Sequence, residues 1–311
     1  MASLKSLRKR YERSIENQDY YGAEQACRMM HHRLTQGKKQ TNEDIEKALS
    51  ILLDASVELL SRKQAQAGTA LGLTAVKHYV DYKTKVTEES VAALQKIADT
   101  FDPTSGNSLE VRREKLRLLR ASLAWSSRED CEGFPNGHPT LNALTARAAA
   151  EVENYELSQQ LYLFSDAPEE SATFLYKYAS EHTNPDEYGL VLTRVIIRYL
   201  ASENLKDACT VRIKFSQLAG WSSIENGGSG NHPPPLGNFC ELLVKLCQLE
   251  KGAGPLYQKI CMIYKNELHR DDSIAPILAR IGTRYFGIQP PQPSGMAEMM
   301  STMLRGMMGN S

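Results

Sequence analysis

The chain has 311 residues, which is enough for one large domain or two modest ones with a sizeable core. Its 37 Lys and Arg residues balance 37 Asp and Glu residues, so no net charge draws it to nucleic acid or to a membrane surface. It contains no run of about 18 apolar residues, so we expect no transmembrane helix and no stable insertion into a membrane.

The N-terminal sequence lacks the apolar stretch of a secretory signal. The six cysteines show no CxxC spacing, and five of them occupy apolar positions of helical runs. This pattern predicts free thiols in a reducing compartment, and therefore a cytoplasmic protein. The six are Cys27, Cys131, Cys209, Cys240, Cys247 and Cys261.

The first part of the chain has the pattern of successive amphipathic helices. Leu4, Leu7, Tyr11 and Ile15 recur at helical spacing and open the series. Further on, acidic residues follow Thr41 and Thr87, as they do at helix starts. The expected helices cover residues 4–15, 19–34, 41–62, 67–82, 87–101 and 108–125.

Residues 126–139 hold two prolines and two glycines and cannot continue a helix. We predict a bend here between an N-terminal half (residues 1–125) and a C-terminal half (residues 140–290), followed by a Met-rich tail (residues 291–311). The second half resumes the helical pattern. Its expected helices cover residues 140–152, 154–165, 168–180, 185–199 and 205–218, with a further helical run from residue 238.

Residues 219–236 interrupt this pattern with a stretch rich in Gly and Pro, which predicts either a loop or a small β-hairpin. Elsewhere the strict alternation typical of strands is almost absent. A weak recurrence relates residues 17–30, 152–164 and 202–215. The sequence therefore predicts an all-α fold, an α-solenoid of tetratricopeptide-like helix pairs.

Signatures of catalysis are missing from the sequence. It has no phosphate-binding Gly-rich loop, no GxSxG and no HExxH. The adjacent His31 and His32 point about 100° apart on a helix, which does not favour a shared metal ion. We expect no enzyme activity, no metal and no cofactor.

Charge and methionine are concentrated at the two ends of the chain. Residues 1–40 carry nine Lys and Arg residues against four acids, which is either a solvated face or a docking patch for an acidic protein. Nucleic acid is disfavoured, because few aromatic residues interleave with the cations. The Met-rich tail is either an amphipathic helix that touches a partner or a disordered end.

Four stretches, taken in order, resemble the Golgi-to-ER traffic protein 4 family in its fungal form. They are "NQDYYGAEQACRMMHHR" (17–33), "LAWSS" with "GHPTLNAL" (123–127 and 137–144), "ENYELSQQLYLFS" (153–165) and "ARIGTRYFGIQPPQ" with the apolar tail (279–308). The resemblance implies a helical-repeat adaptor without catalysis. Such an adaptor bridges a targeting ATPase to a ubiquitin-like adaptor protein, which in turn recruits a tetratricopeptide co-chaperone carrying tail-anchored membrane proteins for insertion into the ER.

The resemblance also implies a site for each partner. The N-terminal half would bind the ATPase through Arg10, Arg13, Tyr20, Tyr21, Gln25, Arg28, Arg33 and Asp81. The C-terminal half would clamp the ubiquitin-like protein between the excursion and the next helix, through Trp221, Ile224, Leu236, Phe239, Leu242, Leu243, Leu246, Leu256 and Tyr257. The Gly- and Pro-rich excursion departs from the strand-forming residues that this family pattern leads us to expect.

A different class of protein remains as the alternative. Helical-repeat scaffold subunits of multi-protein complexes, of the proteasome-lid or signalosome type, share this periodicity. Such subunits usually end in a winged helix with a small sheet, whereas this chain ends in "QPPQPS" and the Met-rich tail.

Overall fold

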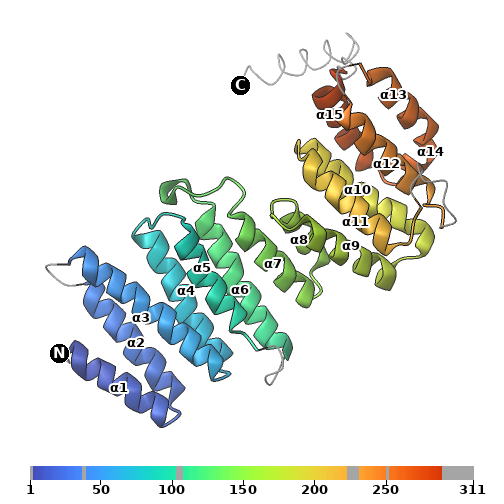
Figure 1. Cartoon of the computed structure of the whole chain (residues 1–311). Helices are drawn as coiled ribbons and strands as arrows, with labels where there is room; N and C mark the ends of the chain where they lie inside the picture. The colour runs from blue at the N-terminus through green and yellow to red at the C-terminus, as the bar shows by residue number, and fades with distance from the viewer. Residues whose placement is uncertain (1–2, 37–39, 103–107, 223–230, 250–251, 289–311) are drawn as a thin grey trace, which may run out of the picture. The chain divides into compact units, whose positions relative to one another are not determined.

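The structure, a computed structural model, describes residues 3–36, 40–102, 108–222, 231–249 and 252–288. In these ranges the chain forms α-helices joined by short turns, with two 3₁₀ turns and one isolated β-bridge (Figure 1). The prediction of an all-α helical-repeat fold is confirmed. The chain divides into two compact units, residues 1–167 and 168–311. The segment 126–139, in which we predicted a bend, lies within the first unit and contains the 3₁₀ turn Glu129–Cys131.

The first unit is a series of helices in which sequence neighbours pack against each other, as in a repeat protein. Its helices are α1 (Leu4–Glu16), α2 (Tyr20–Thr35), α3 (Asn42–Ser61), α4 (Ala65–Asp81), α5 (Glu88–Asp99), α6 (Ser108–Ser126), α7 (Pro139–Glu151) and α8 (Tyr155–Tyr162). Thr41 and Thr87 cap α3 and α5 with reciprocal capping boxes, which explains why those starts were readable in the sequence.

One type of turn joins several of the helix pairs. Its middle residue has left-handed backbone conformation, as at Gln18 (φ 58°), Glu153 (φ 62°) and Glu203 (φ 61°). The next residue is the N-cap of the following helix; the side chain of Asp19, for example, accepts a hydrogen bond from Gly22 N at 2.9 Å. This shared turn is the physical origin of the recurrence among residues 17–30, 152–164 and 202–215.

The core of the first unit consists of two clusters that together run from α1 to α7. Leu52, Leu59 and Leu71 are fully buried where α2, α3 and α4 meet. Further along, Trp125 stacks on Tyr79 at 4.7 Å between ring centroids. The Trp125 indole Nε1 donates to the Thr84 carbonyl at 3.3 Å, so the end of α6 is fixed to the chain after α4.

The second unit is built around one almost fully buried helix, α10 (Tyr188–Ala201), which packs against α9, α11, α12 and α15. The neighbouring helices are α9 (Pro168–His182), α11 (Leu205–Leu218), α12 (Pro235–Gln248), α13 (Gly254–Ile263), α14 (Lys265–Leu268) and α15 (Ile274–Phe286), with a 3₁₀ turn at Pro185–Glu187. The backbones of α10 and α12 approach closely at Gly189, where an added Cβ would lie 2.8 Å from Gly237 N.

The excursion between α11 and α12 is described only at its two ends. A single β-bridge pairs Trp221 with Asn231, and Ser222 N donates to the Asn231 carbonyl at 3.1 Å. Residues 223–230, including Ile224 from the predicted clamp, lie outside the described residues, as does the Met-rich tail.

All six cysteines are free, as predicted, and four of them are buried. None of the helices that the structure describes combines the length and the apolar character that crossing a membrane requires.

Candidate functional site

Three of the predicted ATPase-binding residues of α2 share one face of that helix, which we call the α2 stripe. Tyr21, Gln25 and Arg28 follow the spacing i, i+4, i+7, which places them on one face. Tyr21 is 72% exposed, which is unusual for so large an aromatic side chain. The Arg28 guanidinium is paired with the Glu24 carboxylate at 2.9 Å, and because Arg28 is exposed this pair can exchange for a partner's carboxylate at little cost.

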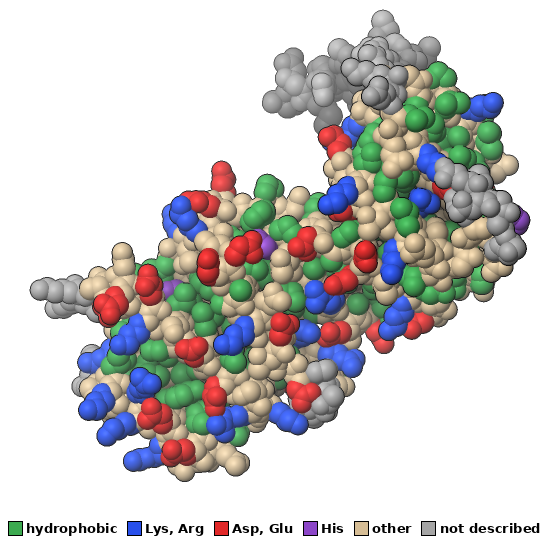
Figure 2. Space-filling view, viewed as in Figure 1, with side chains coloured by type: hydrophobic (Ala, Val, Ile, Leu, Met, Phe, Trp, Pro, Cys, Tyr) green, Lys and Arg blue, Asp and Glu red, His purple; other side chains and the backbone are tan. Residues whose placement is uncertain are grey.

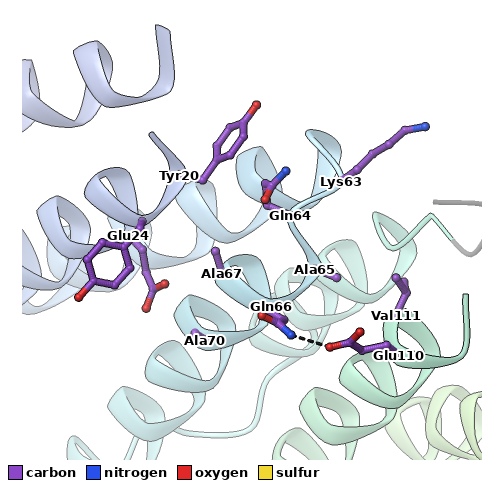
Figure 3. Close-up of a pocket in the computed structure, with 11 residues that line it drawn as sticks. Tyr20, Glu24, Lys63, Gln64, Ala65, Gln66, Ala67, Ala70, Glu110 and Val111 are labelled. Atoms are coloured by element: carbon purple, nitrogen blue, oxygen red, sulfur yellow. Dashed lines mark hydrogen bonds between the residues drawn. The ribbon is translucent and has the colours of Figure 1, made fainter. Parts of the chain in front are cut away.

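A surface depression of about 720 Å³ lies at the N-terminal end of this stripe. The first turn of α2, the first turns of α4 and the start of α6 form its walls (Figure 3). Tyr20 and Glu24 contribute from α2, and Gln66 Nε2 donates to Glu110 Oε1 at 2.5 Å across the gap between α4 and α6. The depression is open and mixed in polarity, so it suits a protein side chain better than a reaction that must exclude water.

The C-terminal ends of α2 and α4 meet at a histidine pair. His31 Nε2 and His78 Nδ1 are 3.0 Å apart, and the ring of Tyr82 lies 4.4 Å from that of His78 between centroids. Burial, with a smaller effect from His31, lowers the pKa of His78 to about 4, so both rings are neutral at pH 7. Asp81 is exposed at this end, where its charge acts on both imidazoles.

The remaining predicted cations also lie on the surface of the first unit. Arg10 and Arg13 are exposed on α1, and Arg33 is exposed near the end of α2. The predicted ATPase-binding residues are thus distributed over α1, both ends of α2 and the end of α4, and Tyr20 and Gln25 are half-buried.

The predicted clamp residues of the second unit are mostly internal. Leu236, Phe239 and Leu243 are at most 1% exposed, because this face of α12 packs on α10 and α11. Leu246 and Tyr257 are also buried, and the Tyr257 hydroxyl donates to the Leu278 carbonyl at 2.6 Å. These five side chains stabilise the unit and are not part of a free surface.

Three members of the predicted clamp keep some exposure. Trp221 is half-buried, with its ring over Gly237 at the start of α12 and 5.5 Å from that of Phe215 between centroids. Leu242 is half-buried on α12, and Leu256 on α13 is 52% exposed.

The structure adds apolar residues that the sequence reasoning missed. Leu249 precedes α13, and Met262 with Ile263 ends it; their exposed fractions are 58%, 71% and 63%. With Leu256 they are exposed large apolar side chains on α13 and just before it, and we call this set the α13 surface. One signal was available: the run Ile260–Ile263 has four consecutive apolar residues, and a helix cannot turn all of them to one core.

The described residues contain no group of three or more His, Cys, Asp or Glu side chains placed to hold a metal ion. Burial raises the pKa of the Cys27, Cys240 and Cys247 thiols to about 12, so these cysteines are protonated and unreactive near neutral pH. Among the described residues, the first unit exposes Tyr21 beside the arginines of α1 and α2, and the second exposes the most accessible large aliphatic side chains, Met262 and Ile263.

Comparison with known proteins gives a consistent result. A family model described as Golgi to ER traffic protein 4 matches residues 42–304. The chain is 27% identical over 300 residues to the Golgi to ER traffic protein 4 homolog of Xenopus tropicalis, and 26% identical over 301 residues to that of Homo sapiens. Each match covers 96% of this chain and 85% of the relative. The crystal structure of C. therm. Get4 has the same fold, with a TM-score of 0.76 at 22% identity over 96% of this chain and 95% of that one.

Proposed function

The chain belongs to the Golgi to ER traffic protein 4 family, and we propose that it is a non-enzymatic adaptor in the targeting of tail-anchored membrane proteins. In this proposal it works in the cytoplasm without a cofactor. It holds a targeting ATPase on the first unit and a ubiquitin-like adaptor protein on the second. Through the latter it reaches a tetratricopeptide co-chaperone that supplies the client protein for insertion into the ER.

One observation carries the proposal: each compact unit exposes its own surface, and the two surfaces differ in chemistry. The first presents Tyr21 and the arginines of α1 and α2, which suit an acidic protein face. The second presents the α13 surface, which suits a buried apolar anchor. A molecule that must hold two proteins at once needs two such independent surfaces.

The ATPase contact is tested by reversing two charges. Because rim charges mainly set association rate and salt dependence, Arg28→Glu with Arg33→Glu should weaken binding of the ATP-loaded ATPase about tenfold or more at low salt. The loss should shrink at high salt. The matched control, Lys96→Glu with Arg120→Glu, makes the same change of net charge on exposed positions of α5 and α6. Full affinity of the double arginine variant by calorimetry would reject this face.

The second contact is tested on the α13 surface and not on the core of α12. Leu256→Asp with Ile263→Asp should leave thermal unfolding nearly unchanged, since both side chains are more than half exposed. The same pair should release the ubiquitin-like protein from the complex while the ATPase stays bound. Gln258→Asp, on an exposed position of the same helix, is the control. If the ubiquitin-like protein still co-purified with the folded double variant, the α13 surface would not be its site.

A further inference from the structure

A second groove in the first unit lies apart from the face assigned to the ATPase. α1 and α3 form its walls and α2 its floor, and it encloses about 830 Å³. Its lining includes none of the eight residues assigned to the ATPase contact and none of those around the depression in Figure 3. It is therefore a separate feature of the same unit.

The floor and lower walls of this groove are apolar. Ile15, Cys27, Met30 and Ala55 are nearly buried beneath it, and Ile51 is half-buried in the α3 wall. The Cys27 thiol, whose pKa burial raises to about 12, adds no charge to the floor. Figure 2 shows hydrophobic side chains edged by basic and acidic ones in the region where Figure 1 draws α1 to α3.

Charge along the rim changes sign from one end of the groove to the other. Lys5 and Arg8 from α1 and Lys47 from α3 stand at the end where both helices begin. Four acids stand further along the same two helices: Glu12, Glu16, Asp54 and Glu58. Arg8 and Glu12 form an exposed pair at 3.4 Å, at the point where the sign changes. A symmetric or purely apolar occupant would not use this polarity.

Tyr11 adds a directional group inside the groove. Its side chain is half-buried, and burial raises its pKa, with smaller contributions from Cys27 and Glu58. Within the described part of the chain its hydroxyl has no hydrogen-bond partner. A phenol in this position can donate to a backbone carbonyl or a polar side chain of a molecule lying in the groove.

We propose that this groove docks an amphipathic helix of another protein, acidic in its first turn and basic in its last. The wall from Leu4 to Ile15 spans twelve residues of α1, so an occupant of similar length is about 18 Å long. Helices prefer acids at the N-terminus and bases at the C-terminus. The occupant therefore lies parallel to α1, with its acidic end beside Lys5, Arg8 and Lys47.

The test uses the full chain and two fluorescent peptides of about fourteen residues with one composition and the same apolar stripe. One peptide has Glu in the first turn and Lys in the last, and the other has these charges exchanged. We expect micromolar binding of the first and about tenfold weaker binding of the second, measured by anisotropy at low salt.

Two matched variants make the test specific to the groove. Lys5→Glu with Lys47→Glu leaves acids at both ends of the groove, so it should weaken binding of the first peptide and abolish the preference between the two peptides. Lys9→Glu with Lys96→Glu, on exposed positions outside the groove, should keep the preference for the first peptide within about twofold of the wild-type value. Circular dichroism should show that both double variants are folded, since all four substitutions are on exposed positions.

Several outcomes would overturn the proposal. They are absence of binding by both peptides at about millimolar concentration, equal binding of the two, or equal effects of the groove and control variants. Self-association of the chain that the groove variant abolishes would assign the groove to a second copy. Vesicle binding abolished by the same variant would assign it to a lipid surface. ATPase binding should be unaffected throughout, so the proposed function can fail or hold independently.

Discussion

Replacing Asp271 by Asn should cost the second unit a pH-dependent part of its stability. The side chain of Asp271 precedes α15 and accepts from Ser273 N at 2.9 Å and from Arg194 Nε of α10 at 2.5 Å. Hydrogen bonds from Ser273, followed by those from Arg194, lower the pKa of this carboxyl from 3.8 to about 2. One side chain thus fixes the start of α15 to the central helix of the unit.

The magnitude follows from the difference in pKa between the folded and unfolded states. Because the folded pKa is the lower one, the stabilisation is complete above the unfolded pKa of 3.8 and is lost as the pH falls towards about 2. A shift of nearly two units corresponds to about 2.5 kcal/mol at neutral pH and to about half of that near pH 3. Arg194, which supplies part of the shift, is 45% exposed, so screening by solvent makes this figure an upper bound.

The assay is urea unfolding of the full chain at about pH 7 and about pH 3, with wild type, Asp271→Asn and Asp272→Asn compared at each pH. Asp272 is the adjacent acid and is exposed, so its substitution should change the free energy of unfolding by less than about 0.5 kcal/mol at either pH. The reasoning is refuted if Asp271→Asn costs the same at both pH values, or no more than Asp272→Asn at neutral pH.

Three further predictions concern stability. Glu153→Gly should raise the free energy of unfolding by up to about 1 kcal/mol, because its φ of 62° favours glycine. Glu156→Gly in the first turn of α8 should lower it, and urea unfolding compares the two variants. Phe239→Ala should lower the free energy of unfolding by about 3–5 kcal/mol because it leaves a cavity, whereas Leu256→Ala, at an exposed position, should lower it by less than about 0.5 kcal/mol. Thermal melts that rank the two variants otherwise would contradict the assigned burial. Burial lowers the pKa of His78 to about 4, so the free energy of unfolding of the wild type should fall by about 2 kcal/mol between about pH 7 and pH 5. That of His78→Gln should fall much less. Equal dependence of the two free energies on pH would show that His78 is not the group responsible.

Much of the helical series could be predicted from the sequence, because local chemistry sets where these helices begin. Asp19 and Thr41 cap their helices through hydrogen bonds to residues three positions on. The common face of Tyr21, Gln25 and Arg28 on α2 could also be predicted, because it follows from their spacing alone.

Tertiary structure alone decided which apolar side chains are free. Periodicity gave α12 an apolar face with Phe239 and Leu243, but it could not show that α10 and α11 already cover that face. It could not show either that Leu256 and Ile263 on α13 stay exposed. Burial depends on neighbours distant in the sequence, as does the pairing of His31 with His78 across 47 positions. A helix's own residues determine that it has an apolar side, and only the packing of the other helices determines whether that side is left for a partner.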